Sequence, residues 1–561
     1  MTELRSEVVV VGGGVAGLVA ALECARLGLS VTVLERAATA GGCVGRIELA
    51  GLTLDSGAES FATRGGGVAE LIEHVGLEGD IVKPNPAGAW LAMPGPKGGV
   101  VAAPLPKTGM LGIPANPLGD DVRAIIGWGG AVRAYADRLT PILRIGRARS
   151  LGDLVRTRMG RKVLDRLVTP ISSGVYSANP DDLDLDVVAP GLNEAMTRAG
   201  SLSGGVAELV ETRRAGSAVL GLRGGMHRLV DALLAELDRF GATVITSAEV
   251  VGLERRAGSP GSPETRGASG AAGVSETRGA SGTPGPSGSP GWRARALVRA
   301  AATGSAADGA HAGARAGTGA GAAEGAAART AADGAAGGAA EADVELVVEA
   351  AYAIVATPAH AARPLLATSV DGWADVPDAP DAASVELVTL VLDAPALAAA
   401  PRGTGVLVAA DTPGVAAKAL THSSAKWAWV AETAAPHQVV RLSYGRLGGA
   451  NPLDGRSDAD VAELAVADAS ALTGVPLDRS MLVDSGRTPW RDALSHAALG
   501  QRDRVRAVEE AVAAVPGLEV TGSWLSGTGL ASVVPHAKEA ASRVRHLAVR
   551  ARAGGETGTS A

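Results

Sequence analysis

The chain has 561 residues and a formal net charge of −7 at pH 7, and aromatic residues make up only 2% of it. This length is sufficient for two or more domains with a core built from Val, Leu, Ile and Ala. The acidic balance speaks against nucleic-acid binding, which usually leaves a basic surface. Two cysteines, Cys24 and Cys43, are too few for a disulfide framework or a cysteine-rich metal site, and they fit a reducing cytoplasm.

The sequence predicts neither a signal peptide nor a spanning segment. Its first residues pass from charged side chains straight into a glycine-rich turn, without the apolar stretch of a signal peptide. No uninterrupted apolar run of about 18 residues occurs, so we expect no membrane-spanning helix. These features predict a cytoplasmic protein and leave peripheral membrane contact open.

The first predicted unit of structure is β-α-β. Residues 8–11 are a continuous apolar run, typical of a strand that is buried on both faces. Residues 16–27 carry apolar side chains at helical spacing, and Gly28 stands where a helix often ends. Residues 30–34 are a second short apolar run, which predicts the next strand.

Gly12, Gly14 and Gly17 form the pattern GxGxxG between the first strand and the helix. Gly12 permits a tight turn, Gly14 lets backbone amides approach a diphosphate, and Gly17 lets the helix pack closely on the strand. The helix N-terminus then directs its positive end towards the phosphates. Glu35 follows the second strand, where a carboxylate binds ribose hydroxyls and would repel the 2′-phosphate of NADP. The unit therefore predicts a dinucleotide site.

FAD is favoured over NAD by two further glycine-rich regions. The glycine pair 41–42 is followed by residues 55–61 (Asp-Ser-Gly-Ala-Glu-Ser-Phe). Near the C-terminus, a predicted strand at 518–520 enters a glycine-rich turn at 521–530, and a predicted helix at 531–548 follows. Two such turns far apart in the chain suit an extended cofactor that is held at both ends.

Two stretches, 257–291 and 303–341, consist largely of Gly, Ala, Ser, Pro and Thr, and the first contains ETRGASG twice. Neither can bury enough apolar surface to offset its ordering entropy, so both are predicted to be disordered. Between them, residues 292–300 alternate Arg with apolar side chains, and residues 343–357 supply partner strands. We interpret this region as strand pairing with a long insertion; a functional tether is the alternative.

Six segments resemble, in order, motifs of the bacterial protoporphyrinogen and coproporphyrinogen III oxidases, which lie within the amine-oxidase-like flavoproteins. The resemblance covers nearly the whole chain outside the two low-complexity stretches. The segments are 56–64 (SGAESFATR), 104–114 (PLPKTGMLGIP), 168–180 (VTPISSGVYSANP), 221–233 (GLRGGMHRLVDAL), 354–362 (IVATPAHAA) and 423–429 (SSAKWAW).

The resemblance implies an α/β fold: a Rossmann-type FAD-binding domain with an inserted α+β substrate-binding domain and a helical subdomain. The implied FAD-binding parts are 1–85, 221–365 and 481–552, the substrate-binding and helical region is 86–220, the second substrate-binding part is 366–480, and 553–561 is a disordered tail.

The resemblance also implies the residues that contact FAD. The backbone of Val250 would meet the adenine, and Trp490 with the second glycine-rich turn would approach the flavin. The implied cofactor residues are Gly12, Gly13, Gly14, Val15, Ala16, Gly17, Glu35, Arg36, Gly42, Cys43, Gly57, Ala58, Glu59, Ser60, Val250, Trp490, Gly527, Thr528, Gly529 and Leu530.

Some positions depart from the family pattern. Thr39 stands where the family has Arg, and Cys43 stands where a basic residue is common. The glycine pair 65–66 replaces a basic pair. Residues 495–497 (Ser-His-Ala) replace a Pro-Gln-Tyr segment, so the rim of the active site differs from the family pattern.

The implied reaction is oxidation of a porphyrinogen to a porphyrin. Full aromatisation removes six electrons, and a flavin accepts two, so three rounds are needed, each ended by O2 with release of H2O2. The cofactor does the redox work, so we expect no catalytic nucleophile, no dedicated base and no metal. The implied pocket residues are Gly174, Val175 and Tyr176, although Tyr176 equally fits core packing.

The substrate's propionates need cations, and Arg64, Lys83 and Lys107 are the candidates, each also explained as a solvated surface charge. The Ala-, Gly- and Arg-rich composition resembles that of actinobacterial proteins, where the family works in the coproporphyrin branch. We therefore favour coproporphyrinogen III over protoporphyrinogen IX. The alternatives are another flavoenzyme of this fold (an amine oxidase or carotenoid desaturase) and a non-enzymatic porphyrin carrier. Transient contact with the next haem-pathway enzyme stays open.

Overall fold

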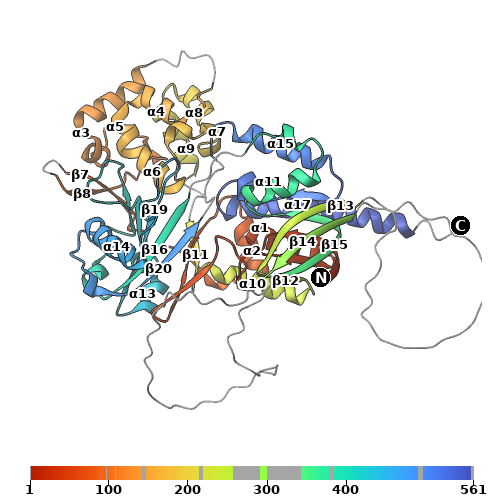
Figure 1. Cartoon of the computed structure of the whole chain (residues 1–561). Helices are drawn as coiled ribbons and strands as arrows, with labels where there is room; N and C mark the ends of the chain where they lie inside the picture. The colour runs from red at the N-terminus through yellow and green to blue at the C-terminus, as the bar shows by residue number, and fades with distance from the viewer. Residues whose placement is uncertain are drawn as a thin grey trace, which may run out of the picture.

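The computed structural model describes residues 2–95, 98–107, 109–140, 147–213, 219–256, 291–299, 343–378, 384–490 and 497–556. The low-complexity stretches predicted at 257–291 and 303–341 lie outside the described residues, apart from Gly291, which begins a strand. Figure 1 shows one part of the molecule built on a sheet near the N-terminus, and another that combines a second sheet with a group of short helices.

The first sheet grows from the predicted β-α-β unit. Its strands are β1 (Thr2–Val11), β2 (Val31–Leu34), β12 (Thr243–Ile245), β13 (Ala248–Arg256), β14 (Gly291–Val298), β15 (Val344–Val355) and β21 (Leu518–Val520). The order is β12-β2-β1-β15-β14-β13, with β21 beside β15. β12, β2, β1, β15 and β21 pair in parallel, whereas β14 runs antiparallel to β13 and β15. The predicted pairing of 292–300 with 343–357 is confirmed.

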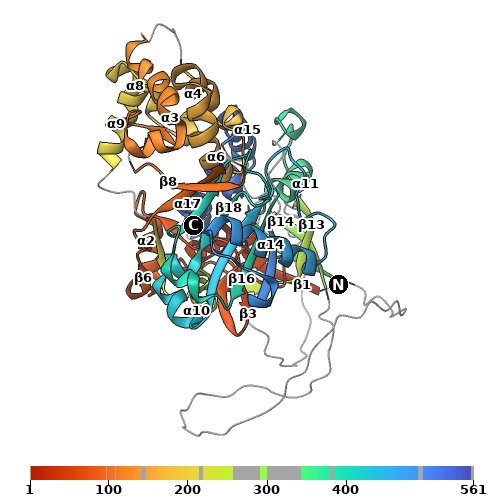
Figure 2. The ribbon, with the colours of Figure 1, turned by 90° about the vertical axis from the view of Figure 1, so that its left-hand side faces the viewer.

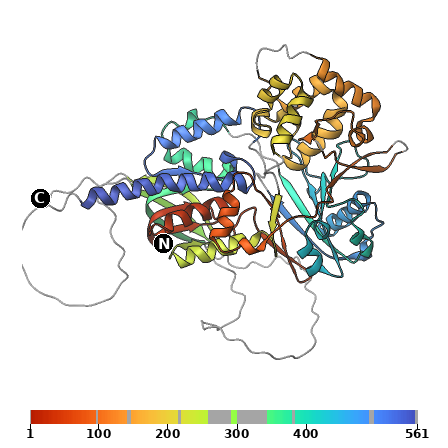
Figure 3. The ribbon, with the colours of Figure 1, turned by 180° about the vertical axis from the view of Figure 1, so that it is seen from behind.

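Alternate side chains of β1 face opposite layers, because successive residues of a strand point to opposite faces. Val8 and Val10 pack into a core formed with α1 (Val15–Ala25), α2 (Gly67–His74), α10 (His227–Arg239) and α17 (Leu530–Glu556). Val9 and Val11 face α11 (Ala359–Ser369), α15 (Gln501–Ala513) and α16 (Ser523–Ser526). Seen from behind in Figure 3, the long C-terminal helix lies beside α1, which in turn contacts α10. The sheet is therefore covered on both sides, as the apolar run predicted.

The second sheet has the order β20-β16-β19-β18-β17-β7-β8. Its strands are β7 (Ala89–Pro94), β8 (Val100–Pro104), β16 (Val385–Leu392), β17 (Gly405–Val408), β18 (Ala419–His422), β19 (Gln438–Tyr444) and β20 (Leu482–Trp490). All neighbours are antiparallel except β17 and β7. Helix α14 (Asp458–Thr473) packs on one face. β20 thus pairs with β16 in this second sheet, whereas the resemblance placed 481–552 in the FAD-binding part. β20 has few apolar residues, so its sequence does not indicate which strand it pairs with.

The helical part follows β8 in the chain and stands at the top of Figures 1 and 2. Its elements are a hairpin of β9 (Gly109–Met110) and β10 (Ile113–Pro114), then α3 (Asp120–Tyr135), α4 (Leu151–Met159), α5 (Arg161–Val163), a π-helical turn (Leu164–Val168), α6 (Thr169–Val175), α7 (Leu185–Val188), α8 (Leu192–Ala199) and α9 (Leu202–Arg213). Met110 and Ile113 of the quoted family motif lie in its core. That motif therefore holds the helical part together.

Short elements join the two parts. They are β3 (Arg46–Leu49), β4 (Leu52–Asp55), β5 (Phe61–Ala62), β6 (Ile81–Val82), β11 (Val219–Leu222), α12 (Ser423–Lys426) and α13 (Ala428–Ala434). Helix α17 continues to Glu556, so 553–556 are helical where a disordered tail was predicted, and 557–561 lie outside the described residues. Across the part of the chain that the structure describes, no helix is both long and apolar enough to cross a bilayer. The predicted α/β fold class is confirmed.

Candidate cofactor and active site

The glycines of the GxGxxG turn are required by the packing around them. Gly12 has φ +106°, and a Cβ there would lie 2.9 Å from the carbonyl of Ala356. A Cβ on Gly17 would lie 1.9 Å from the carbonyl oxygen of Gly12. By contrast, a Cβ on Gly14 would meet nothing closer than the Cα of Gly42 at 4.0 Å. The turn is therefore closed towards the sheet at Gly12 and Gly17 and open at Gly14.

Glu35 follows β2 and directs its carboxylate at this turn. Its Oε2 accepts a hydrogen bond from the amide of Gly13 at 2.7 Å, and its Oε1 accepts one from the amide of Ala37 at 2.7 Å. The neighbouring Arg36 is exposed. The acid thus stands beside the glycine-rich turn at the end of the second strand, where a ribose-binding carboxylate is expected.

The glycine pair 41–42 forms the opposite wall. The amide of Gly41 donates to the carbonyl of Gly13 at 2.8 Å, and Gly41 forms a parallel bridge with Gly14. The next residue, Cys43, is exposed, while the surrounding protein raises the pKa of its thiol through desolvation. The Cys43 carbonyl accepts a hydrogen bond from the amide of Ala58 at 2.8 Å.

Three features show that the residues fit a dinucleotide. Helix α1 begins at Gly14 without a side-chain cap and without an acidic residue in its first turn, so its first amides remain available to an anion. Thr357 lies beside Gly12, and its buried hydroxyl has no hydrogen-bond partner. Gly529, in the second glycine-rich turn, has φ +97°, and a Cβ there would meet nothing within 4 Å. Backbone donors thus face the open space beside Gly14 and Gly529, which we call the crevice and which leaves room for the phosphates.

The second glycine-rich turn brings the C-terminal segment to the same part of the sheet. β21 pairs with the end of β15, and Trp524 donates from Nε1 to the carbonyl of Thr357 at 3.0 Å. Gly527 and Leu530 are buried, and Thr528 is partly buried. Val250, predicted to meet the adenine, lies on β13 just before a register shift in its pairing with β14. These predicted cofactor residues are thus distributed along the first sheet.

Residues 55–60 run from β4 along the junction of the two parts, and Asp55 ties this loop to α10. Its Oδ2 accepts from the amide of Met226 at 3.0 Å, and its Oδ1 accepts from the amide of His227 at 3.1 Å. The His227 ring Nδ1 also lies 3.1 Å from Oδ1. Because α10 has no capping side chain of its own, Asp55 satisfies its first amides from a distant strand.

Glu59 in the same loop is held by two cations of the second-sheet part. Its Oε1 pairs with Nζ of Lys426 from α12, and its Oε2 lies 3.2 Å from Nη2 of Arg441 on β19. Burial raises the pKa of the Glu59 carboxyl, but the charges of Arg441 and Lys426 outweigh it and hold that pKa below its usual range. Glu59 is among the predicted cofactor residues, and its carboxylate is engaged with these two cations.

Gly57 is enclosed on two sides. A Cβ on Gly57 would lie 2.1 Å from the carbonyl oxygen of Cys43 and 2.9 Å from the indole ring of Trp490. Trp490 also donates from Nε1 to the carbonyl of Ser56 at 3.3 Å. The predicted residue Gly57 therefore lies against both Cys43 and Trp490, with Ala58 next to it in the chain.

The predicted substrate residues are placed on different elements. Gly174 lies on α6 against β17, since a Cβ there would lie 2.6 Å from the Leu407 side chain. Tyr176 is partly buried against the core of the helical part. The side chain of Val175 lies outside the described residues. Arg64 donates to the hydroxyl of Ser532 at 3.2 Å, at the start of α17, so its contact is with the first-sheet part.

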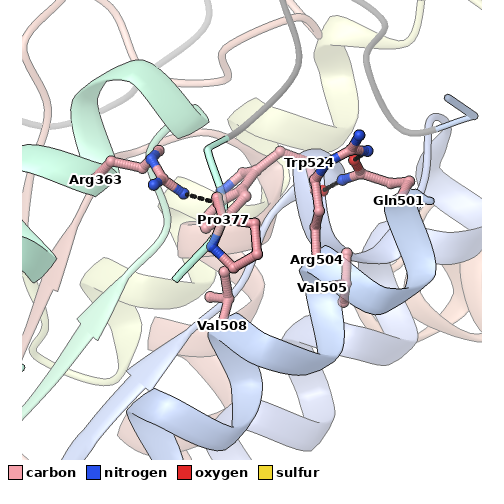
Figure 4. A pocket seen from close by; sticks show the side chains of 7 residues that line it. All are labelled: Arg363, Pro377, Gln501, Arg504, Val505, Val508 and Trp524. Atoms are coloured by element: carbon pink, nitrogen blue, oxygen red, sulfur yellow. Dashed lines mark hydrogen bonds between the residues drawn. The ribbon is translucent and has the colours of Figure 1, made fainter. Parts of the chain in front are cut away.

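Two of the small cavities in the described part of the chain lie near residues discussed above. The first lies between α11, α15 and α16 and is lined by Arg363, Gln501 and Trp524 among others (Figure 4). In this cavity the side-chain amide of Gln501 donates to the carbonyl of Trp524 at 3.0 Å, so this hydrogen bond holds α15 against α16. The second, of about 20 Å³, is lined by Glu59 and Arg441 among others and is large enough for a single water molecule.

A second buried cation lies apart from this loop. Lys418, just before β18, is 1% exposed, and its ammonium donates to the hydroxyl of Ser177 after α6. Burial, with a smaller effect from the charge of Arg446, lowers the pKa of Lys418 to about 7. Lys418 thus joins the helical part to the second sheet, and near neutral pH its ammonium is only partly protonated.

Sequence reasoning missed Arg441 and Lys426 as members of the site. Lys426 stands within the quoted SSAKWAW segment, and Arg441 is the one charged residue in the strand QVVRLSY. A lone arginine in a strand of this kind signals a buried partner. The partner, Glu59, lies 382 positions earlier, a separation that no local pattern reveals. Within the described residues, no group of His, Cys, Asp or Glu could hold a metal ion.

Comparison with known proteins defines the class. Residues 15–271 match the protein-family model of flavin containing amine oxidoreductases. The fold is shared with a crystal structure from Exiguobacterium sp. 255-15, a protein provisionally named a protoporphyrinogen oxidase, at a TM-score of 0.68 with 22% identity over 98% of this chain and 100% of that one. Over residues 15–271 the chain is thus similar to flavin-dependent oxidoreductases, and its cofactor is FAD.

Several of its curated relatives are named coproporphyrinogen III oxidase, and one from Nicotiana tabacum is named mitochondrial protoporphyrinogen oxidase. The protein from Mycobacterium bovis is 26% identical over 542 residues, which cover 95% of this chain and 96% of the relative. The matched segment spans only 51% of the Propionibacterium freudenreichii protein, at 26% identity, and 46% of the Bacillus subtilis protein, at 25% identity.

Proposed function

We propose that this chain is an FAD-dependent oxidase that converts coproporphyrinogen III to coproporphyrin III in haem biosynthesis. The observation that carries the proposal is the similarity to the mycobacterial coproporphyrinogen III oxidases, which extends over 95% of the chain and therefore includes both sheets. The crevice supports it, because its glycines, free helix amides and acid suit a bound dinucleotide.

In this proposal the first sheet holds the cofactor. The amides at the start of α1 bind the diphosphate, Glu35 binds the ribose, and loop 55–60 with Trp490 and residues 527–530 borders the flavin. When bound, FAD supplies two-electron oxidation, and O2 takes up the electrons with release of H2O2. Three such rounds remove the six electrons and six protons that separate a porphyrinogen from its porphyrin.

The second sheet and the helical part would hold the substrate. Gly174, Val175 and Tyr176 lie where α6 meets the second sheet, so we place the porphyrinogen between this wall and the loop 55–60. These residues orient the ring and exclude water, and no nucleophile, base or metal is needed. Arg64 stays in the proposed substrate set as an exposed cation at the junction with α17.

The proposed partners are the porphyrinogen and O2, and the proposed location is the cytoplasm. Two cysteines without a disulfide pattern support this location. Contact with the next haem-pathway enzyme would allow a reactive porphyrin to be passed on without release.

The test is porphyrin fluorescence in air, with coproporphyrinogen III and protoporphyrinogen IX supplied in parallel to the purified FAD-loaded protein. Faster oxidation of coproporphyrinogen III with stoichiometric H2O2 is the expected result. Preference for protoporphyrinogen IX would move the enzyme to the other branch. No oxidation of either by a protein with bound FAD would refute the proposal, and an amine and carotenoid panel would then test the rival flavoenzymes.

A further inference from the structure

One arginine of the second sheet holds the backbone of the loop 55–60. Arg441 donates from Nη1 to the carbonyl of Gly57 at 2.8 Å and to that of Asp55 at 3.3 Å. Its Nη2 lies 3.2 Å from Oε2 of Glu59 in the same loop. The side chains of Arg441 and Glu59 are only 12% and 11% exposed. One guanidinium therefore contacts the loop at three positions.

Burying this arginine in a strand carries a desolvation cost, which a surface ion pair does not incur. The cost is offset because the planar guanidinium finds two carbonyl oxygens and one carboxylate in matching directions. Lys426 supplies a second cation to Glu59, so the loop lies between two positive groups of the second-sheet part. This arrangement joins the two parts of the molecule at a single loop.

The far side of that loop is the crevice wall. The amide of Ala58 donates to the carbonyl of Cys43 at 2.8 Å, and no side chain fits on Gly57 between Cys43 and Trp490. A shift of the loop would therefore move the wall of the crevice as well. The position of the second sheet relative to the crevice is set through these contacts.

We propose that Arg441 is a positioning residue of the flavin site, with Glu59 and Lys426 as its charge partners. It sets the loop 55–60 against the bound flavin and fixes the distance between that flavin and the substrate wall. The inference rests on the proposed function, since it takes this loop to border FAD. Arg441 acts through the loop and need not touch the substrate.

The variants Arg441→Met, Arg441→Lys and Glu59→Gln test this role. Arg441→Met removes both carbonyl contacts and the charge, whereas Arg441→Lys keeps the charge without the fork of donors. We expect Arg441→Met to lower kcat by about 10- to 100-fold with KM within about threefold, because small displacements of reacting groups have effects of this size. Arg441→Lys should retain part of kcat, and the kcat of Glu59→Gln should lie between those of the two Arg441 variants.

The matched control is Arg402→Met. Arg402 also donates to two backbone carbonyls, those of Ala471 at 2.9 Å and Leu472 at 2.6 Å, in the second-sheet part. Burial lowers the pKa of Arg402. It shares the carbonyl contacts and burial of Arg441 but not the loop, so it reports the purely structural cost of losing such an arginine.

The decisive measurement is the absorption spectrum of bound FAD and the affinity of the flavin for sulfite, neither of which needs a porphyrinogen. Arg441→Met should shift both, and Arg402→Met should leave both as in the wild type while lowering the melting temperature similarly. Unchanged flavin properties in Arg441→Met, or the same change in Arg402→Met, would overturn the positioning role. If the wild type oxidises no porphyrinogen, the absorption spectrum and the sulfite affinity still test the positioning role of Arg441. A wild type that binds no FAD would refute both proposals.

Discussion

The two parts of the molecule place their functional groups by different means. Around the crevice of the first sheet, most contacts are made by backbone: the amide of Gly41, the start of α1, and glycines that leave no room for a Cβ, together with the amide of Gly13, which donates to the Glu35 carboxylate. In the second-sheet part, buried charged side chains make the contacts, namely Arg441 with Glu59, and Lys418 with Ser177.

The difference predicts two kinds of sensitivity. A site formed by backbone is disrupted when a single carbon is added to a closely packed glycine, because the main chain itself must then move. A side-chain site accepts changes of shape but responds to charge and pH, because its groups were desolvated on folding. Substitutions in each part should therefore differ in size and in pH dependence.

The largest effect is expected for Gly17→Ala in the crevice. The new Cβ would lie 1.9 Å from the Gly12 carbonyl oxygen, so α1 must move away from β1, and we expect a loss of about 4 kcal/mol or more in the free energy of unfolding. Chemical denaturation and the FAD content after purification measure it. Gly79→Ala, where a Cβ meets nothing within 4 Å, is the control. A Gly17→Ala protein as stable as the wild type would contradict the backbone argument.

Lys418→Met tests the second-sheet part. The pKa of Lys418 is about 7 in the folded protein and about 10.5 when unfolded, so the unfolded chain binds the proton over this window and stability rises with pH between these values. Below about pH 7 both states are protonated and the penalty is constant, on the order of 3–5 kcal/mol. Lys418→Met should remove the penalty and this slope.

The measurement for Lys418→Met is denaturant unfolding from pH 6 to 10, as the difference between variant and wild type. The exposed Lys83→Met is the control and should leave the pH slope as it is. If Lys418→Met instead destabilises the protein equally at every pH, the ammonium is compensated in the folded state and the comparison between the two parts fails there.

A smaller effect is expected for Asp55→Asn at the junction. The amide keeps one acceptor oxygen where the carboxylate has two, so one of the first amides of α10 loses its partner, and the loss should be about 2 kcal/mol. Thermal unfolding checks it. Asp231→Asn on the same helix is the control, because its pair with Arg46 is exposed. Equal losses of stability in Asp55→Asn and Asp231→Asn would show that Asp55, as a helix cap, contributes no more than an exposed surface charge.

The smallest effect is expected for Trp490→Phe. It removes the indole N–H that donates to Ser56 while an aromatic ring remains beside Gly57, so about 1 kcal/mol should be lost together with a small shift in the FAD spectrum. The control is Trp128→Phe, whose side chain is 64% exposed. A spectrum unchanged in Trp490→Phe would place Trp490 away from the flavin.

The elements that sequence patterns predicted are those whose signals are local. The β1–α1–β2 unit follows from an apolar run, helical spacing and three glycines, and β21 was predicted at 518–520 as the structure has it. β20 was not predicted to belong to the second sheet, because its residues show no alternation of apolar and polar side chains from which a partner strand could be inferred.

The part of the site made by long-range contacts could not be predicted. Asp55 caps a helix that begins at His227, and Glu59 meets Lys426 and Arg441. Each residue taken alone resembles an ordinary surface charge, and only the folded chain brings the opposite charges together. The resemblance to known oxidases indicated the loop that contains Glu59 as a cofactor contact, but it did not indicate the two cations that pair with the Glu59 carboxylate.

The pairing of β1 with β15 has a consequence for the order of folding. Thr2 pairs with Leu346, and β21 joins the same strand later still, so the sheet that forms the crevice is completed only when most of the chain has been synthesised. The helical part between α3 and α9 is built from consecutive elements, which supply most of its core, although Ala409 and Ala497 join that core later. Because contacts between distant residues form slowly, we expect the helical part to be structured on the ribosome before a binding-competent crevice exists.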